Sequence, residues 1–592
     1  MVAKVRPHRP ADPVLSATRQ RRVSILALFL ALAAFLTLGA YQLDLPGLHY
    51  DEAREAGVNA MQLLTGQPVT AFRGATVQLG PWRLPLMVQD YIGALNVVLA
   101  IPFLGVGGIL VVALRWLPLV IGALTLLLAW RVAYSLGGPG AAAVSALLLA
   151  VNPSFVFWSR QGIFVTNLTA LLFMASLLAA IRWWRRRERR YLWITALLFG
   201  LGIYAKLLFV WVIGAMAGVA LSAWAIARWG GRPAGSAAEG EPGKGEESPA
   251  GPGARQRTHG GAAAWLVAGL CFLIPLLPLI VFNLRTEGTL AAIFGNLHKS
   301  YYGIDNSAYL ANLQARAVQV IALLRGDHFW YLGEAFANPW APWLAAALIT
   351  GALAFGLGRS KVITLLGLLA LAAAQSAFTV SDLFITHYAL LLPLVPLSAG
   401  VACAAWMRGA TQGSRTPVGA PLVGALTLKT TLRALPAIVP VLLVAWWGVG
   451  DLWTTVRYHR VLRISGGYAA HSDAIYDLAS YLEHSGQSAP LALDWGLDAP
   501  VRFLTAGKVN PVEVFGYESL AAPDDAFADR VRGALADPSA LFLAHSPQAA
   551  VFGGRVKALE ALAAQNGLHL LEDASFSERN GRPLFEVYRV AP

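Results

Sequence analysis

Residues 23–43 read VSILALFLALAAFLTLGAYQL, and the segment 49-HYDEARE-55 follows after a short connection. The first segment carries no charged side chain, and about 20 apolar residues are enough for a helix to cross the hydrocarbon core of a bilayer. The second segment places two adjacent carboxylates, Asp51 and Glu52, just beyond the end of that helix. We therefore expect this acidic pair to lie at a membrane surface rather than in bulk water.

The composition of the whole chain is typical of a protein with many membrane-spanning helices. Of its 592 residues, 56% are hydrophobic and 13% are charged, whereas soluble domains carry about 25% charged residues. The net charge of +13 does not indicate nucleic-acid binding, because the basic residues cluster between apolar runs, as in cytoplasmic loops, and no RNA- or DNA-binding motif is present. Cys271 and Cys403 lie within apolar runs and indicate neither a disulfide nor a zinc site.

The arrangement of apolar and basic segments predicts about eleven membrane spans and their orientation. The apolar stretch 91–108 is interrupted by Asn96 and Pro102. If it spanned, the arginine cluster at 182–190 would lie on the outer side, against the positive-inside bias, so we predict that it lies in the interface. The N-terminus is then cytoplasmic, and a multi-pass protein of the plasma (inner) membrane is expected. The predicted spans are about 23–44, 109–130, 141–158, 163–181, 191–205, 207–227, 263–284, 339–358, 362–379, 386–407 and 434–454.

The chain is predicted to divide into a basic cytoplasmic tail, a helical transmembrane domain and a C-terminal α/β domain outside the cytoplasm. Their predicted bounds are 1–22, 23–455 and 456–592. Within the transmembrane domain, a Gly-, Pro- and Ser-rich stretch without apolar periodicity predicts a disordered cytoplasmic loop at 228–262. The polar and aromatic segment 285–338 is predicted to be an outer loop.

The C-terminal domain alternates between helix-like and strand-like segments. Residues 474–484 have the spacing of an amphipathic helix, and short apolar runs at 489–494, 540–545 and 584–590 are typical of strands. Counting spans places this domain on the same side of the membrane as Asp51.

A first transmembrane helix followed by an acidic pair in the first outer loop, residues 45–108, resembles the GT-C glycosyltransferases. The closest branch is that of the protein O-mannosyltransferases and lipid A aminoarabinose transferases, and the resemblance covers about residues 1–455. Further short matches follow in the same order, namely 81-PWRLP-85, 159-SR-160, 204-YAK-206 and 386-THYALLLP-393. The resemblance implies a sugar donor on a polyprenyl phosphate and a lipid, glycan or protein acceptor at the outer face of the bilayer.

The resemblance also assigns roles to the acidic pair. The catalytic base of the family falls on Asp51, and Glu52 would position the acceptor or hold a divalent ion. A carboxylate in a partly dry site can have a raised pKa and accept a proton from an attacking hydroxyl. Alternatively, both carboxylates are simply solvated.

A departing lipid phosphate needs fixed positive charge nearby. Arg83 stands where the resemblance implies a basic phosphate contact, and three further basic residues lie at outer helix ends or in an outer loop. Each could instead extend its side chain to the lipid headgroups. The candidates for binding the donor phosphate are Arg83, Lys206, Arg160 and Lys299.

Aromatic and histidine side chains near the outer face are candidates for binding the substrates, because aromatic rings stack on sugars. They could equally form an interfacial aromatic belt. These residues are His298, Tyr301, Tyr302, His387 and Tyr388.

We leave a divalent metal as an open alternative without assigned ligands, because no metal-binding spacing is present. The sequence thus predicts an inverting glycosyltransferase. The two rival hypotheses are a transporter or flippase of lipid-linked sugars and a non-catalytic protein of cell-envelope assembly.

Overall fold

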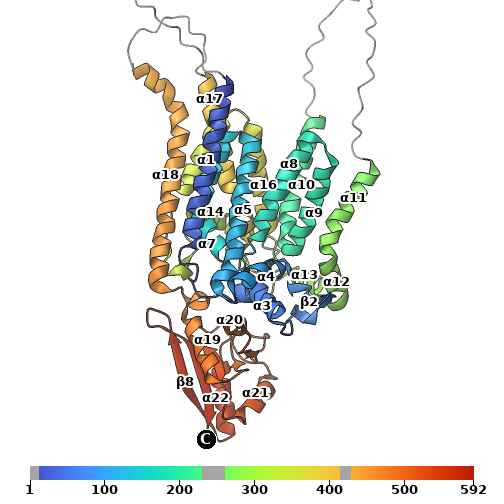
Figure 1. Cartoon of the computed structure of the whole chain (residues 1–592), viewed down its shortest axis with the longest axis vertical. Helices are drawn as coiled ribbons and strands as arrows, with labels where there is room; N and C mark the ends of the chain where they lie inside the picture. The colour runs from blue at the N-terminus through green and yellow to red at the C-terminus, as the bar shows by residue number, and fades with distance from the viewer. Residues whose placement is uncertain (1–12, 230–260, 414–427) are drawn as a thin grey trace, which may run out of the picture.

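The structure is a computed structural model that describes residues 13–229, 261–413 and 428–592. Figure 1 shows a bundle of long helices and, attached at one end of it, a smaller domain of strands and short helices that contains the C-terminus. Residues 1–12 of the predicted tail and 230–260 of the predicted cytoplasmic loop lie outside the described residues. Residues 13–22, also assigned to the tail, form the beginning of the first helix.

The bundle is built from helices at the positions of the stretches predicted to span the membrane. They are α1 (Pro13–Ala40), α5 (Val111–Gly137), α6 (Pro139–Val151), α7 (Pro153–Arg160), α8 (Leu168–Arg186), α9 (Arg189–Ala205), α10 (Val210–Trp229), α11 (Ala262–Leu273), α12 (Leu277–Thr286), α15 (Ala341–Phe355), α16 (Arg359–Ser376), α17 (Leu394–Gly413) and α18 (Leu428–Ser465).

Among the described residues, six helices are long and apolar enough to cross a membrane, or up to eight if each of two bent helix pairs forms one span. A helical membrane-type fold is therefore confirmed. Other predicted spans correspond to shorter helices, such as α9 with 17 residues and α15 with 15. The number of eleven spans stays a prediction.

The bend between α6 and α7 has a clear local cause. The two helices meet at 60°, where Pro153 cannot donate the backbone hydrogen bond that would continue α6. The side chain of Asn152 instead accepts a hydrogen bond from the backbone N–H of Phe155 at 3.0 Å and caps α7. Because of this bend, α7 ends inside the protein, and Arg160 and Gln161 are both buried.

The predicted first outer loop folds into short elements at the end of the bundle that faces the C-terminal domain (Figure 1). The last of these elements, α4, has 13 residues and is too short to cross a hydrocarbon core of about 30 Å. The elements are α2 (Tyr50–Glu52), the π-helix η1 (Ala53–Gly57), α3 (Val58–Thr65), η2 (Phe72–Gly74), the hairpin of β1 (Thr76–Leu79) and β2 (Trp82–Pro85), the pair β3 (Met87–Gln89) and β4 (Ile92–Gly93), and α4 (Leu95–Gly107).

The segment 285–338 is more ordered than the predicted outer loop. It contains α13 (Gly288–Gly295) and α14 (Tyr309–Arg325). Helix α14 packs against α15 and α16 of the bundle, and Arg316 of α14 is fully buried. The polar composition of this segment concealed a helix because polar side chains such as Arg316 bond to backbone carbonyls inside the protein, here that of Ser376 at 3.0 Å.

The C-terminal domain is built on a five-stranded sheet with the order β6-β5-β7-β9-β8. Strand β5 runs parallel to β6 and β7, whereas β9 runs antiparallel to β7 and β8. Separate apolar clusters are centred on residues such as Leu543 and Phe542, which are neighbours on β7 and therefore point to opposite faces of the sheet. The strands are β5 (Leu491–Ala492), β6 (Val512–Glu513), β7 (Phe542–His545), β8 (His569–Ser577) and β9 (Pro583–Ala591), and the helices are α19 (Ala474–Ser485), α20 (Asp498–Leu504), α21 (Phe527–Leu535) and α22 (Arg555–Gln565).

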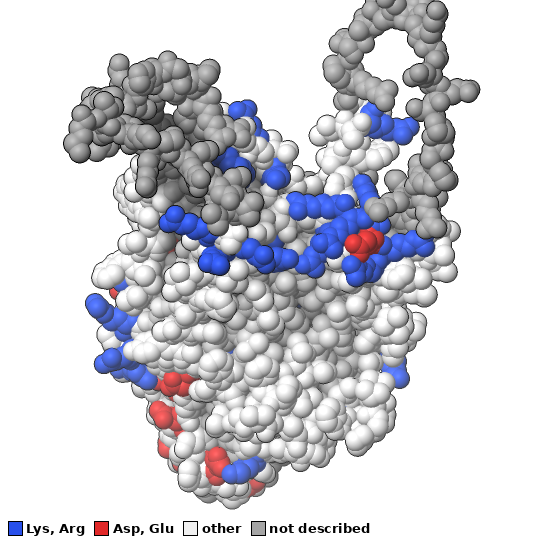
Figure 2. All heavy atoms as spheres, turned by 45° about the horizontal axis from the view of Figure 1, so that its top comes forward, with Lys and Arg blue, Asp and Glu red and all other residues white. Residues whose placement is uncertain are grey.

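Basic residues gather at the end of the bundle opposite the C-terminal domain. Figure 2 shows a band of Lys and Arg side chains across this end, which includes the turn between α8 and α9. Within that turn, Arg186 and Arg190 pair with Glu188 at 3.7 and 2.6 Å. The two ends of the molecule therefore differ in charge, and the positive-inside bias would place the basic end in the cytoplasm.

Candidate active site

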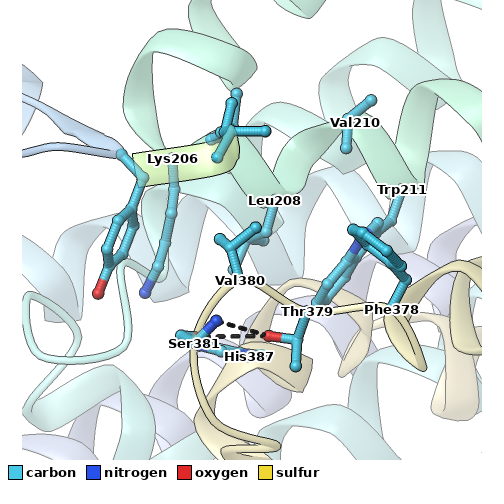
Figure 3. Close-up of a pocket in the computed structure, with 12 residues that line it drawn as sticks. Lys206, Leu208, Val210, Trp211, Phe378, Thr379, Val380, Ser381 and His387 are labelled. Atoms are coloured by element: carbon cyan, nitrogen blue, oxygen red, sulfur yellow. Dashed lines mark hydrogen bonds between the residues drawn. The ribbon is translucent and has the colours of Figure 1, made fainter. Parts of the chain in front are cut away.

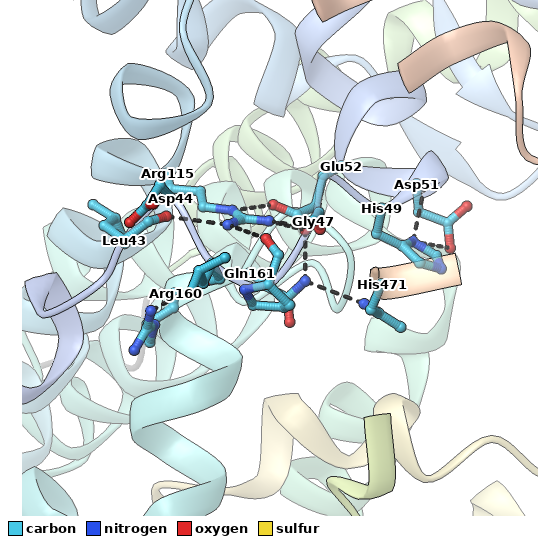
Figure 4. A network of polar contacts seen from close by, with 12 residues as sticks. Leu43, Asp44, Gly47, His49, Asp51, Glu52, Arg115, Arg160, Gln161 and His471 are labelled. Atoms are coloured by element: carbon cyan, nitrogen blue, oxygen red, sulfur yellow. Dashed lines mark hydrogen bonds and ion pairs between the residues drawn. The ribbon is translucent and has the colours of Figure 1, made fainter. Parts of the chain in front are cut away.

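Glu52 is buried inside the protein, where an arginine and a glutamine bind its carboxylate. Its carboxylate accepts two hydrogen bonds from Arg115 of α5, at 2.8 and 3.0 Å, and one from the side-chain amide of Gln161 at 2.7 Å. Figure 4 shows these contacts converging on Glu52. The side chain is 1% exposed, so a substrate cannot reach it. The predicted role of Glu52 in positioning the acceptor or holding a divalent ion is therefore not supported, and we infer that Glu52 fixes the fold of the loop.

Arg115 ties the same loop to the bundle. Besides Glu52, its guanidinium donates to the backbone carbonyls of Leu43, Pro46 and Gly47 at 2.7–3.1 Å. Arg115 was not among the predicted site residues, although a single arginine within an apolar run is itself a signal that an acidic partner lies nearby. Gln161 was also missed, and nothing in its local sequence distinguishes it.

Arg160 is engaged in a way that does not fit the predicted phosphate contact. It is fully buried. One terminal nitrogen of its guanidinium donates to the backbone carbonyls of Gln42 and Leu45, and the other lies 3.0 Å from Nδ1 of His459. Arg160 therefore holds the connection between α1 and α2 in place, and its burial separates it from any bound donor.

Two stacked histidines connect the acidic loop to the start of the C-terminal domain. His49 precedes α2, and its Nδ1 accepts a hydrogen bond from the backbone N–H of Asp51 at 3.1 Å. Its ring stacks on His471 of η7 (Ala469–His471) at 4.3 Å. Burial lowers the pKa of His49 to about 3 and holds that of His471 well below its usual value. Both rings are therefore neutral, which allows Nδ1 of His49 to act as an acceptor.

Asp51 differs from Glu52 in that its carboxylate is not enclosed. Its side chain is 24% exposed. Burial and the neighbouring charge of Glu52 raise the pKa of Asp51 to about 6, although the positive charge of Lys206 acts in the opposite direction. A carboxylate with this pKa is ionised at neutral pH and is basic enough to accept a proton.

A second acid, Glu55, joins Asp51 and Lys206. It lies on η1, four residues after Asp51 and so on the same side of the helical segment. Burial, together with the charge of Asp51, raises the pKa of Glu55 well above its usual value. One oxygen accepts a hydrogen bond from Gln89 at 3.3 Å, and the charge of Lys206 and the side chain of Thr166 act against the rise in the pKa of Glu55. Sequence analysis did not select Glu55, although its spacing from Asp51 was a usable signal.

Lys206 brings a positive charge to this acidic group and also lines a cavity. It stands between α9 and η3 (Leu207–Phe209) in extended conformation and is buried. Its ammonium interacts electrostatically with both Glu55 and Asp51. Figure 3 shows its side chain extending along the cavity wall. Lys206 is thus the predicted phosphate-binding residue that the structure brings together with Asp51.

The cavity at Lys206 has a volume of about 300 Å³ and mostly apolar walls. The polar side chains on its walls include His387 of η6 (Ile385–Leu391), which Figure 3 labels opposite Lys206. Apolar wall residues come from η3 and α10, from α13, and from the segment that follows α16. They are Leu207, Leu208, Val210, Trp211, Ile293, Phe378 and Val380.

The other predicted substrate-binding residues occupy different surroundings. Tyr302 is more than half exposed, and the negative charge of Asp51 is one cause of the raised pKa of its hydroxyl, after burial. Tyr301 donates a hydrogen bond to the backbone carbonyl of Tyr517 in the C-terminal domain at 3.3 Å. Tyr388 is fully buried, with its hydroxyl 2.9 Å from Ser376, and so serves the fold. His298 and Lys299 are exposed and do not line the cavity.

Arg83 lies in a second, polar cavity of about 460 Å³ together with Arg73 and Arg285. The Nε atom of Arg83 donates to Thr76 at 2.9 Å, and Arg73 forms a paired contact with Asp90, also at 2.9 Å. The two cavities are close neighbours along the chain, because Asp90 binds Arg73 of the second cavity and the next residue, Tyr91, lines the first.

Comparison with known proteins supports the fold. A sequence profile described as dolichyl-phosphate-mannose-protein mannosyltransferase matches residues 99–233. The crystal structure of ArnT from Cupriavidus metallidurans bound to undecaprenyl phosphate is similar with a TM-score of 0.55 at 14% identity, covering 95% of this chain and 97% of that one. The apo structure of ArnT covers the same shares, with a TM-score of 0.54 and 14% identity. This chain has the fold of a GT-C glycosyltransferase. A search of curated protein sequences finds no significant match.

Within this GT-C fold, the described residues contain no group of three or more His, Cys, Asp or Glu side chains arranged to hold a metal ion. Asp51, Glu52, His298 and His387 do not form such a group. Asp51, Glu55 and Lys206 instead combine two carboxylates with an ammonium, which is a set of groups suited to moving a proton and binding an anion.

Proposed function

We propose that the protein transfers a sugar from a polyprenyl-phosphate donor to an acceptor at the outer face of the plasma (inner) membrane, with Asp51 as the base. One observation carries this proposal. A partly exposed carboxylate with a pKa of about 6 interacts with Lys206, and Lys206 lines an apolar cavity. A proton acceptor and a cation for a phosphate thus share one site.

The proposed reaction is a single displacement with inversion at the anomeric carbon. The acceptor hydroxyl or amine gives its proton to Asp51 while its lone pair forms the new bond to the anomeric carbon. The electron pair of the breaking carbon–oxygen bond leaves with the lipid phosphate. Lys206 stabilises the negative charge that grows on the phosphate, and this effect is strong because the site is largely shielded from water.

The donor would be held by both cavities. The apolar cavity next to Lys206 suits the first part of a prenyl chain, and His387 on its wall is a candidate sugar contact. Arg83, with Arg285 and Arg73, supplies a cationic surface on the other side of Asp90 and Tyr91 for phosphate oxygens. The shared fold of a protein solved with undecaprenyl phosphate bound supports a lipid phosphate as the leaving group.

The C-terminal domain would cover the site from outside the cytoplasm. Its contacts with the acidic loop run through His471, which stacks on His49, and through the backbone carbonyl of His471, which accepts from Gly47 at 2.8 Å. A Trp495 ring packs against Tyr50 at 4.6 Å. Because this domain contacts residues just before Asp51, and its helix α20 packs against η1 just after Asp51, we propose that it selects the lipid, glycan or protein acceptor.

The test is transfer by the purified full-length protein in detergent, with a panel of radiolabelled polyprenyl-phosphate sugars and an extract of envelope lipids and glycans as acceptor. We expect labelled product together with free polyprenyl phosphate. Asp51→Asn should abolish both while leaving expression and thermal unfolding unchanged. Asp525→Asn removes an exposed acid of the C-terminal domain and serves as the matched control with full activity.

Three results would contradict the proposal. Full transfer by the Asp51→Asn variant would remove Asp51 from the mechanism. Movement of intact donors across reconstituted bilayers, without any release of polyprenyl phosphate, would favour a flippase, and tolerance of substitutions at both Asp51 and Lys206 would favour a non-catalytic assembly protein.

A further inference from the structure

A groove of about 500 Å³ lies between α1 and α18, apart from both cavities described above. Its walls are Thr37, Leu38 and Tyr41 on the side of α1, and Val456, His459, Arg460, Arg463 and Ile464 on the side of α18. Figure 1 shows these two helices at the same edge of the bundle. Each packs mainly on other helices, α1 on α5 and α6, and α18 on α6, α15 and α17, so the groove between them is left open.

The α18 side of the groove is one continuous helix face. Its five residues are spaced three, one, three and one apart, which places them in a single stripe along an α-helix. Val456 and Ile464 are exposed apolar side chains, and Arg460 and Arg463 are exposed basic ones. Together with Leu38 and Tyr41, this stripe offers an apolar wall and two positive charges to the same ligand.

The two arginines have no acidic partner among the described residues. Other arginines nearby do have partners, since Arg579 pairs with Asp473 at 2.6 Å and the guanidinium of Arg457 stacks over Phe336 at 3.8 Å. Within the part of the chain that the structure describes, Arg460 and Arg463 take part in no such ion pair or ring contact. Their charge is therefore available to an anion that enters the groove.

The polar and apolar residues of the groove are arranged like the headgroup and the acyl chains of a lipid. Tyr41, Arg460 and Arg463 lie at the helix ends next to the C-terminal domain, where a membrane surface would be, whereas Leu38 and Val456 lie further into the bundle. We propose that the groove binds one anionic phospholipid, with its phosphate on Arg460 and Arg463 and its acyl chains along α1 and α18. The charge of the arginines selects an anionic headgroup over a zwitterionic one.

This lipid would not be the acceptor of the proposed reaction. His459 forms the floor of the groove and contacts Arg160 at 3.0 Å, and Arg160 in turn binds the backbone carbonyls of Gln42 and Leu45. Arg160 and this backbone stand between the groove and the acidic loop. The lipid would brace the helices that support the loop, and its binding does not depend on the proposed transfer reaction.

The experiment is native mass spectrometry of the full-length protein in detergent, after incubation with phosphatidylglycerol or with phosphatidylcholine of the same acyl chains. We expect one retained phosphatidylglycerol and little phosphatidylcholine. The double variant Arg460→Gln/Arg463→Gln should bind phosphatidylglycerol about thirtyfold more weakly, because each arginine near a membrane surface contributes about 1 kcal/mol to anionic lipid binding. Arg457→Gln on another face of α18 is the matched control and should bind as the wild type does. Arg460→Lys/Arg463→Lys keeps both charges and should retain the lipid.

Three outcomes would overturn the proposal. Equal retention of phosphatidylglycerol and phosphatidylcholine would show that charge does not select the lipid. An equal loss in Arg457→Gln and in the double glutamine variant would show that the groove residues are not the site. Loss of sugar transfer in the double glutamine variant with phosphatidylglycerol retained would make the groove a substrate path instead. Failure of transfer in the wild type would count only against the proposed function.

Discussion

Replacing each of the two adjacent acids of the first outer loop with its amide should have different effects, a loss of stability for Glu52 and a loss of transfer for Asp51. Glu52→Gln leaves the Arg115 guanidinium buried without a counter-charge, and removal of one partner of a buried ion pair costs about 3–5 kcal/mol. Asp51→Asn removes a partly exposed carboxylate without a paired cation in contact, so it should leave stability almost unchanged and abolish transfer. The same chemical change, one residue apart, thus separates the acid that holds the loop from the acid proposed as the base.

A double-mutant cycle sharpens this prediction. Arg115→Met alone leaves Glu52 charged and unpaired, and it also removes hydrogen bonds to three carbonyls that contribute about 1 kcal/mol each. In the variant with both Arg115→Met and Glu52→Gln, neither member of this buried pair carries a charge. We expect the combined loss of stability to be smaller than the sum of the single losses by on the order of 3 kcal/mol.

The cycle is measured by urea unfolding of the purified variants in detergent, followed by tryptophan fluorescence. Additivity of the two substitutions within about 0.5 kcal/mol would refute the reasoning, since it would mean that Glu52 and Arg115 do not stabilise each other. Normal stability of Glu52→Gln combined with complete loss of transfer would also refute it, because that result would return Glu52 to the chemistry.

Three further predictions follow from charged groups, two of them at the candidate site and one, Glu513 of β6, in the C-terminal domain. The rate of transfer at subsaturating donor should fall about tenfold per pH unit below pH 6, because Asp51, with a pKa of about 6, is then protonated. A rate that stays constant between pH 4.5 and 6 would exclude Asp51 as the base. Lys206→Met should lower kcat by about a hundredfold or more and move the acid limb of the pH profile upwards, because a charge that favours ionised Asp51 is lost, whereas an unshifted limb would show that the two groups do not interact. Burial raises the pKa of Glu513 to about 7, so the folded state holds its proton more tightly than the unfolded chain and stability falls as the pH rises from about 4.5 to 7. Glu513→Gln should remove this fall and be more stable than the wild type at pH 8, which thermal unfolding can measure. An unchanged pH dependence of stability would show that Glu513 is not the group responsible.

The helical membrane-type fold could be predicted because apolar length and charge distribution are local properties of a sequence. Uncharged runs such as 23–43 and the basic segment 182–190 carry that information without any knowledge of partners. The segment around α14 shows the limit of the method. Its polar side chains are satisfied by backbone carbonyls of other helices, and composition alone cannot distinguish such a helix from a solvated loop.

The candidate site was only partly predictable, because its decisive contacts join distant segments. Asp51 and Lys206 were selected from short motifs, and the structure brings their charges together. Arg160 was selected in the same way, yet the bend at Pro153 turns it into the protein, where it binds backbone carbonyls. The partner of Glu52 lies 63 residues along the chain, so the role of that acid could not be read from its neighbours.

The different surroundings of Asp51 and Glu52 are consistent with helix geometry. Successive residues of a helix point about 100° apart, so two adjacent side chains can meet different surroundings, and here the side chain of Glu52 is 1% exposed whereas that of Asp51 is 24% exposed. The inward acid meets the guanidinium of Arg115 and becomes a fixed counter-charge. The other remains partly exposed, beside a buried lysine, where a proton can reach it. A single acidic pair can therefore supply both the anchor of the loop and its proposed reactive group, which is why replacing each acid with its own amide, rather than deleting the loop, is the informative perturbation.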